Sequence, residues 1–317
     1  MLDQLALAGL IPIIKVQDAQ DAPPLCKALM DGGLPVAEIT FRTAAAEEAI
    51  KLVNAQYPDI LLGAGTVLTT DQADRAWAAG ARYIVSPGFN PRVVQHCLDK
   101  GYPILPGCSS PSDIEQAIEL GLTAVKIFPA GALGGVATIK ALAGPYTEMQ
   151  YVPTGGVDAK NLLEYLSFPK VLACGGSWMV PQSAVETKDW AKIQALASEA
   201  VDLLLGFEIV HIGVNSANAQ DAKAAAERLS KLFHWPIREG QANYFVGTGV
   251  EIMKTPFLGA HGHVAIGTNS VERAQWHLER RGFTFNEETA RKGPDGKLRF
   301  VYLAEEIAGF AFHLIQK

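Results

Sequence analysis

The first two-thirds of the chain repeats one pattern of apolar and polar positions. A short run of β-branched and other apolar residues ends in glycine, proline or a polar residue, and an alanine-rich stretch with helical spacing follows. Because the runs are largely continuous in apolar character, they predict strands that are buried on both faces. Eight runs follow this pattern: Ile11–Val16, Val36–Phe41, Leu61–Val67, Tyr83–Gly88, Pro103–Cys108, Ala124–Ala130, Tyr151–Gly156 and Val171–Trp178.

Helical segments separate these eight predicted strands. Asp71–Ala79 and Ser112–Leu120, for example, show helical spacing with a capping residue near the start. Strand and helix alternating eight times in about 200 residues is typical of a closed parallel barrel, so residues 1–206 are predicted to form an α/β fold, a (β/α)8 TIM barrel. An open doubly wound sheet is the alternative, and the eight regular units favour closure.

The pattern changes after a long predicted helix, Asp189–Leu205. Beyond it the predicted strands are longer and half-exposed, and charged residues are denser. Two similar segments begin at His211 and His263, and each precedes a helix. Each half closes with a similar strand: Val250–Lys254 in the first half and Phe312–Gln316 in the second. This duplication predicts a second domain, of the α+β class, built from two βαβββ units in residues 207–317.

Composition narrows the classes of function. The 317 residues carry a net charge of −6 and contain no run of lysine and arginine, which argues against nucleic-acid binding. The N-terminal segment lacks the basic start of a signal peptide, and no uncharged stretch is long enough to cross a bilayer, so we expect a cytoplasmic protein. The scattered cysteines are expected to be reduced, buried thiols: Cys26, Cys97, Cys108 and Cys174.

A lysine in the sixth predicted strand is the most informative candidate, because barrels of this type carry their active residues at the C-terminal ends of the strands. Lys126 is flanked by apolar residues in Val125-Lys-Ile-Phe-Pro-Ala. Burial disfavours the ammonium form, and a neutral amine can attack a ketone to form an imine. Lys15, at the end of the first strand, would add like-charge repulsion in the same direction. A strand-end lysine that reaches solvent is the structural alternative.

A carboxylate interrupts the second predicted strand. Glu38 lies in Val36-Ala-Glu-Ile-Thr-Phe-Arg, where an unpaired charge would be costly to bury. An ion pair with Arg42 or Lys126 would explain it structurally, and a general acid/base beside an imine would explain it functionally. The two explanations are compatible, since a catalytic carboxylate beside a lysine is also its counter-ion.

Glycine pairs follow the last two predicted strands, at Gly155-Gly156 and Gly175-Gly176. Barrel enzymes frequently bind a phosphate at these loops, against backbone N–H groups. Turns also require glycine, so one pair alone is weak support, but two pairs on adjacent strands favour a phosphate site. An imine-forming lysine, a carboxylate, an arginine and a phosphate site together suit a 2-keto acid with a distal phosphate.

At these residues the sequence closely resembles the 2-keto-3-deoxy-6-phosphogluconate (KDPG) / 4-hydroxy-2-oxoglutarate (KHG) aldolase family. The matching segments occur in family order and cover essentially all of residues 1–206. They are Glu38-Ile-Thr-Phe-Arg-Thr, Gly63-Ala-Gly-Thr-Val-Leu, Ser86-Pro-Gly, Lys126-Ile-Phe-Pro-Ala, Pro153-Thr-Gly-Gly-Val and Gly175-Gly-Ser-Trp.

The resemblance implies a role for each matching residue. Lys126 would be the Schiff-base lysine, and Glu38 the general acid/base. The substrate-binding residues implied are Arg42 and Thr66 for the pyruvyl carboxylate, Pro87 and Phe128 for the pocket wall, and Thr154, Gly155, Gly156, Gly176 and Ser177 for the phosphate. The family is usually a homotrimer, and its chemistry uses the covalent lysine imine with no metal or other cofactor.

The implied reaction is a carbon–carbon bond cleavage. Lys126 condenses with the C2 ketone, and Glu38 removes the C4 hydroxyl proton as the C3–C4 bond breaks. Glyceraldehyde 3-phosphate leaves, the enamine is reprotonated, and water releases pyruvate. KHG, which has no phosphate, would give pyruvate and glyoxylate. The sequence leaves the preference open, although the glycine segments favour a phosphorylated substrate.

Residues 208–317 resemble a vicinal oxygen chelate domain, the fold of glyoxalases. In metal-binding members each half supplies one ligand from its first strand and one from its last. The matching positions here are His211 and Glu251, then His263 and His313. The family more often has glutamate at the fourth place, so His313 is a departure that still suits zinc, nickel, manganese or iron. His261 lies close enough to compete for the assignment.

Other functions remain open on the sequence alone. A phosphate-binding barrel isomerase or decarboxylase would keep the glycine segments without an imine. A ligand-binding scaffold would use Lys126 and Glu38 only as an ion pair. The second domain could be a metal-dependent enzyme, or a structural appendage in which the polar positions are ordinary strand residues.

Overall fold

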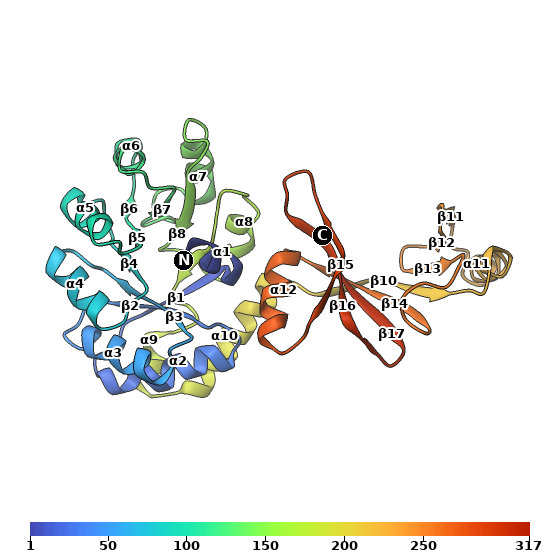
Figure 1. Cartoon of the computed structure of the whole chain (residues 1–317), viewed down its shortest axis with the longest axis horizontal. Coiled ribbons are helices and arrows are strands. Elements are labelled where there is room, and N and C mark those ends of the chain that lie inside the picture. Colours follow the sequence, from blue (N-terminus) through green and yellow to red (C-terminus); the bar gives the residue numbers. More distant parts are fainter. The chain divides into compact units, whose positions relative to one another are not determined.

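The chain folds into two units, which comprise Met1–Leu204 and Leu205–Lys317. The computed structural model describes residues 1–317, and Figure 1 colours them in sequence order.

Parallel strands form the interior of the first unit, with helices around them (Figure 1). Two hydrogen-bonded groups occur, in the orders β5-β4-β3-β2-β1-β9 and β6-β7-β8. The strands are β1 (Leu10–Ile14), β2 (Val36–Thr40), β3 (Leu61–Gly65), β4 (Tyr83–Val85), β5 (Ile104–Leu105), β6 (Gly107–Cys108), β7 (Ala124–Ile127), β8 (Gln150–Pro153) and β9 (Cys174–Gly176).

The fifth predicted strand is divided into β5 and β6 by Pro106. Proline has no backbone N–H and cannot donate to the ladder, so the regular pairing stops there. Its carbonyl still accepts from the Lys126 backbone N–H at 2.9 Å, which keeps β7 beside this segment. The two groups of strands are therefore joined through a short irregularity rather than separated.

The parallel sheet is curled. β9 pairs with β1, and the isolated bridges Tyr151↔Val171 and Thr154↔Gly175 link β8 to the segment that contains β9. Parallel neighbours therefore run from β5 through β1 and β9 to β8. This curl lets strands that are not neighbours face one another across the interior.

Three helices of the first unit begin at side chains that satisfy their first N–H groups. Thr69 and Asn90 accept from the N–H groups of Gln72 and Arg92, and Ser110 forms a capping box with Asp113. None of the helices is long and apolar enough to span a bilayer. The helices are α1 (Leu2–Ala8), α2 (Ala22–Asp31), α3 (Ala46–Gln56), α4 (Thr70–Ala78), α5 (Pro91–Asp99), α6 (Pro111–Glu119), α7 (Gly135–Ala143), α8 (Leu162–Leu166), α9 (Gln182–Glu186) and α10 (Trp190–Leu205).

One eight-stranded sheet forms the second unit, in the order β11-β12-β13-β10-β14-β17-β16-β15. The first half is β10 (Glu208–Asn215), α11 (Ala219–Phe233), β11 (Ile237–Glu239), β12 (Asn243–Val246) and β13 (Val250–Met253). The second half is β14 (Gly262–Thr268), α12 (Val271–Arg280), β15 (Phe285–Lys292), β16 (Leu298–Ile307) and β17 (Phe310–Gln316). In each half the first strand pairs in parallel with the last, and β10 joins β14 antiparallel, so the internal repeat has the order βαβββ twice.

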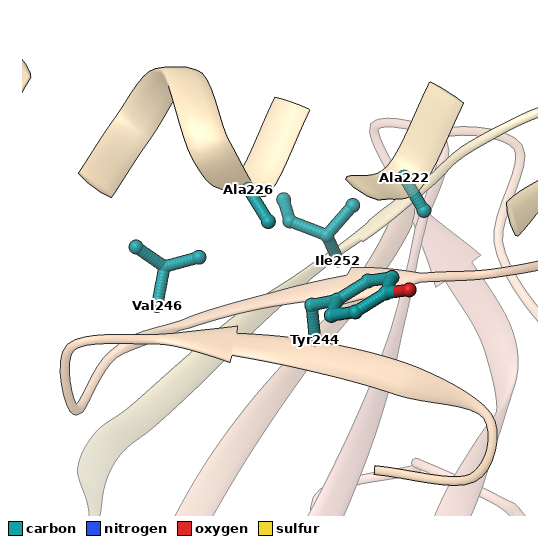
Figure 2. Packing of buried hydrophobic residues seen from close by; sticks show 5 residues of the cluster. All are labelled: Ala222, Ala226, Tyr244, Val246 and Ile252. Carbon is teal, nitrogen blue, oxygen red and sulfur yellow. The ribbon is translucent and has the colours of Figure 1, made fainter. Parts of the chain in front are cut away.

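The core of the first half lies between α11 and two strands (Figure 2). Ala222 and Ala226 of α11 pack on Tyr244, Val246 and Ile252. The small alanine side chains let the helix approach the sheet closely. Because side chains alternate along a strand, the residue before Ile252 points to the opposite face, away from this helix.

Candidate active site and a histidine cluster

A buried ion pair crosses the interior of the first unit. Lys126 lies in β7 between β6 and β8, and Glu38 lies in β2 between β1 and β3. The Lys126 Nζ and Glu38 Oε1 atoms are 3.5 Å apart, and their side chains are only 7% and 4% exposed. Of the two partners expected for Glu38, it is Lys126 that pairs with it. The two groups proposed for imine chemistry are therefore adjacent and shielded from water.

The space for the Glu38 carboxylate depends on glycine. A side chain at Gly65 would collide with Glu38 Oε1, and one at Gly63 would collide with the ring of Tyr83. The Tyr83 hydroxyl donates to the Ala37 carbonyl at 3.2 Å. Burial, and then the charge of Glu38, raise the pKa of Tyr83 well above its ordinary value, so the phenol stays neutral.

The Glu38 Oε1 atom itself is buried and makes no hydrogen bond. Its near neighbour is the Lys126 Nζ atom, at a distance longer than a typical hydrogen bond. This oxygen is therefore available to accept a proton from a third group. A carboxylate that is satisfied by several backbone donors could not act as a base so readily.

The side chains expected to hold a carboxylate follow β2 and β3. Arg42 is exposed, and its Nε donates to Thr40 Oγ1 at 3.2 Å. Thr66 has a φ of 57°, in the left-handed region that side chains with a branched Cβ seldom adopt. Such strain persists where the surroundings impose it, and it often marks a functional position.

The residues expected to line the pocket lie at the same ends of their strands. Pro87 follows β4 and is half-buried. Phe128 follows β7 and is 37% exposed, and the Lys126 Nζ lies 5.4 Å from the centroid of its ring. Lys15 follows β1 and is half-buried. An aromatic face beside an amine offers both an apolar wall and a weak attraction for the cation.

The glycine segments come together at the ends of β8 and β9, where the Thr154↔Gly175 bridge joins them. Gly155 and Gly156 have φ angles of 86° and 79°, which other residues rarely adopt. A side chain at Gly176 would collide with the ring of Trp178. Ser177 follows β9 and is exposed. The bridge therefore brings the five residues expected to bind phosphate into one region: Thr154, Gly155, Gly156, Gly176 and Ser177.

Three residues of this site were not identified from the sequence. Thr40 contacts Arg42, Gly65 makes room for Glu38, and Tyr83 packs beside Glu38. The motif Gly63-Ala-Gly contained a signal for Gly65, because alternate glycines in a buried strand mark a close approach. Thr40 and Tyr83 look like ordinary strand residues, so only the fold reveals their contacts.

The second unit holds a compact histidine cluster. Ligand atoms of His211, His263 and His313 lie within 4.8 Å of one another. Glu251 Oε2 lies 2.9 Å from the His263 Nε2 atom and 3.2 Å from the His211 Nε2 atom. Asn243 donates to the other oxygen of Glu251. The four predicted positions therefore converge on one face of the sheet.

The electrostatics of this cluster suit a cation. Burial raises the pKa of Glu251, but the hydrogen bonds and charges of His211 and His263 outweigh it and hold the pKa well below its usual range. Burial, followed by the charges of His263 and His211, lowers the pKa of His313 to about 3. The cluster thus offers a carboxylate and, at His313, a neutral imidazole, which are the forms that bind metals.

A cavity of about 370 Å³ lies over the cluster. Besides the four clustered side chains it is lined by Phe245, Met253, Phe257, Glu288, Thr289, Arg291, Phe300, Tyr302 and Ile315. Its size and its partly aromatic lining suit a small molecule. His261 is exposed, lies against Phe310, and is not part of the cluster.

Comparison with known proteins places the first unit in a family. The family model described as KDPG and KHG aldolase matches residues 2–196. A 2-dehydro-3-deoxy-phosphogluconate aldolase of Treponema pallidum is 49% identical over 204 residues, which cover 64% of this chain and 97% of the relative.

Two solved structures are similar over the same part of the chain. The KDPG aldolase of Legionella pneumophila, determined with pyruvate as a covalent carbinolamine intermediate, is 37% identical with a TM-score of 0.61, and the match covers 63% of this chain and 98% of that one. The enzyme of Zymomonas mobilis, determined with 3-phosphoglycerate, is 38% identical with a TM-score of 0.60 and covers 63% and 94%. With its matching fold and its buried lysine–glutamate pair, this chain belongs to the KDPG and KHG aldolase family.

Proposed function

We propose that the first unit is a Schiff-base (class I) aldolase that cleaves KDPG to pyruvate and glyceraldehyde 3-phosphate. KHG is a second substrate of the same site and gives pyruvate and glyoxylate. The observation that carries the proposal is the buried pair of Lys126 and Glu38, 3.5 Å apart. An isomerase or decarboxylase that binds phosphate would not require this lysine.

The reaction divides between the two residues. The Lys126 amine attacks the C2 carbonyl of the substrate and loses water to form an imine. Glu38 takes the C4 hydroxyl proton, the C3–C4 electron pair moves into the imine, and the aldehyde leaves. The resulting enamine is protonated at C3 by Glu38, and water hydrolyses the imine to release pyruvate. The free Oε1 atom of Glu38 supports this role.

The other residues orient the substrate. Arg42 and Thr66 bind the carboxylate, and Pro87 and Phe128 line the pocket. The phosphate is held by Thr154, Gly155, Gly156, Gly176 and Ser177. The likeness to a relative determined with 3-phosphoglycerate, and the joined glycine segments, support a phosphorylated substrate.

The proposed function goes with a closed barrel and a trimeric assembly. The curled sheet closes as a (β/α)8 barrel in residues 1–206, supported by the pairing of β9 with β1 and the two bridges to β8. The enzyme is a cytoplasmic homotrimer, as the family resemblance implies. Light scattering of the purified protein would give three times the 33.9 kDa mass of one chain.

Reduction with borohydride in the presence of pyruvate tests the aldolase. The expected product is a chain that carries one reduced pyruvyl group, mapped to Lys126 by peptide mass analysis. Lys126→Met should remain unlabelled. The matched control Lys140→Met, which replaces a lysine of α7, should be labelled like the parent. An adduct on Lys15, or none, would refute the mechanism.

For the second unit we propose a vicinal oxygen chelate domain, residues 207–317, that binds a divalent metal. His211, Glu251, His263 and His313 would hold the ion, and their convergence and charge support the fit. The Nδ1 atoms of His263 and His313 are buried without a hydrogen bond. These two imidazoles therefore lack the second hydrogen bond that usually orients a metal-binding histidine. When bound, the ion supplies a Lewis acid that polarises a substrate oxygen.

Metal analysis of variants tests the second proposal. The parent protein is expected to bind one ion of zinc, nickel, manganese or iron per chain. His211→Ala should lose it, and His261→Ala, which alters an exposed histidine outside the cluster, should retain it. Stoichiometric metal in His211→Ala would refute the proposed ligand set and leave the second unit as a structural appendage.

A further inference from the structure

Thr40 occupies an unusual place beside the candidate active site. It is the last residue of β2, it is only 2% exposed, and it lies two positions before Arg42. A buried hydroxyl must satisfy its hydrogen-bonding capacity within the protein. Its partners therefore determine what this residue does.

The direction of each hydrogen bond at Thr40 is fixed by chemistry. Thr40 Oγ1 lies 2.8 Å from the Ile14 carbonyl oxygen, which can only accept, so the single hydroxyl proton points to Ile14. The oxygen lone pairs are then free to accept, and Arg42 Nε donates to them at 3.2 Å. The hydroxyl thus links the end of β1 to the guanidinium of Arg42.

This contact restricts an exposed arginine. A guanidinium presents five N–H groups, and the pair of terminal nitrogens can bind both oxygens of a carboxylate. Because Nε is held by Thr40, rotation of the guanidinium about the end of its side chain is limited before the substrate arrives. Pre-ordering a charged group lowers the entropic cost of binding.

We propose that Thr40 is a positioning residue, which holds Arg42 by Nε so that the terminal nitrogens receive the carboxylate of a 2-oxo acid. In this way Thr40 contributes to the selection of carboxylate-bearing ketones over other ketones. The proposal rests on the aldolase function of the first unit, in which Arg42 binds the substrate carboxylate.

A matched control exists three residues away. Thr43 Oγ1 donates to the Val16 carbonyl at 2.7 Å, so it makes the same kind of link to the segment after β1 without contacting Arg42. Thr43→Val therefore removes an equivalent structural hydrogen bond. Thr40→Ser keeps the hydroxyl, and Thr40→Val removes it at nearly constant volume.

The test compares pyruvate with methyl pyruvate, which has the ketone but no carboxylate. Borohydride labelling of Lys126 is measured against the concentration of each ketone in the full-length variants. For Thr40→Val, the pyruvate concentration that gives half-maximal labelling should rise about tenfold, corresponding to one hydrogen bond to a charged group. The value for methyl pyruvate should not change. Thr40→Ser and Thr43→Val should both resemble the parent.

Turnover of KDPG gives a second readout. In Thr40→Val the KM should rise about tenfold with a smaller change in kcat, because positioning of the carboxylate affects binding more than chemistry. In an Arg42→Ala background, Thr40→Val should have no further effect. If valine is not tolerated, Thr40→Ala removes the same hydroxyl without added contacts.

The outcomes separate the two proposals. In Thr40→Val, the ketone concentration for half-maximal labelling could be unchanged for pyruvate, or could rise equally for pyruvate and methyl pyruvate. Either result would overturn the role of Thr40 without contradicting the aldolase function. An equal rise in Thr43→Val would show a general structural effect and would also overturn it. A parent protein that is not labelled at Lys126 would refute the aldolase function, and this inference with it.

Discussion

The carboxylate of Glu38 lies among apolar strands with Lys126 as its charged neighbour. Removing either ion would leave the other buried without a partner, which typically costs several kcal/mol. A pair of apolar side chains of similar volume is often as stable as such an ion pair. The pair is therefore better explained by chemistry than by stability, and the Gly65 position that accommodates the carboxylate serves the same end.

Replacing the carboxylate with an amide should separate imine formation from cleavage. Glu38→Gln keeps the side-chain volume but cannot accept the C4 hydroxyl proton. We expect kcat for KDPG to fall about 100- to 10,000-fold, the usual contribution of a general base. Labelling by pyruvate and borohydride should still reach Lys126 at equilibrium. Steady-state kinetics and peptide mapping provide the two measurements.

The control for this variant is Glu47→Gln. Glu47 lies in α3 and pairs with Arg75 at the surface, so its loss should leave kcat unchanged. A kcat for Glu38→Gln within tenfold of the parent would contradict the assignment of Glu38 as the base.

At the scale of elements, capping residues determined where several helices begin. Ser112–Leu120 was predicted as helical, and α6 occupies Pro111–Glu119 because Ser110 and Asp113 form a capping box. The Asp113 carboxylate accepts from the backbone N–H groups of Ser109 and Ser110 at 2.8 and 3.0 Å. Burial raises the pKa of Asp113, but these hydrogen bonds lower it below the ordinary value.

This shift predicts a dependence of stability on pH. Because the folded-state pKa of Asp113 is depressed, its contribution is present above the unfolded-state pKa and is lost as the pH falls through the folded-state pKa. At pH 7, Asp113→Asn should lower the free energy of unfolding by about 1 kcal/mol, as for other caps. Urea unfolding at pH 7 and at pH 3 should show a smaller difference at pH 3.

Glu119→Gln is the control, since it removes an exposed carboxylate from the other end of α6. It should leave the unfolding free energy at pH 7 within about 0.5 kcal/mol of the parent. A difference for Asp113→Asn that is as large at pH 3 as at pH 7 would exclude the ionised cap as its cause.

Much of the site could be predicted from strand ends, and the remainder depends on the curl of the sheet. Lys126 and Glu38 stand out in the sequence because each interrupts an apolar run, and an ion pair between them is one of two expectations for Glu38. The choice of Lys126 over Arg42 as partner could not be predicted, because it requires β2 and β7 to face each other across the interior. Thr40 is invisible to sequence reasoning for a similar reason, since its partner Ile14 comes from a different strand.

On the scale of the whole molecule, the two units differ in their thiols. Cys26, Cys97, Cys108 and Cys174 all lie in the first unit, and all are buried. Burial raises the pKa of Cys26 to about 12. Burial, and to a smaller extent the charge of a nearby aspartate, also raise the pKa values of Cys97 and Cys108 to about 12. Thiolate, the reactive form, is therefore scarce at neutral pH.

Thiol reactivity should consequently report on the first unit alone. With a disulfide reagent at pH 8, the native protein should react slowly or not at all, and the protein in denaturant should release four equivalents. As the urea concentration rises, the thiol reaction should follow loss of aldolase activity rather than loss of the metal that we propose for the second unit. One rapidly reacting equivalent in the native protein would contradict the burial of these side chains.

The duplicated sheet gives the histidine cluster a divided origin. The first strands supply His211 and His263, and the last strands supply Glu251 and His313, so each half contributes two of the four side chains. A polypeptide that ended after β13 would keep only half of the set, whatever the stability of that half. The two halves share the order βαβββ, yet they differ in formal charge at one matched position. Glu251 is the only carboxylate of the four, so the negative charge of the cluster comes from the first half alone. A metal bound as proposed would therefore be neutralised mainly from the first half of the repeat.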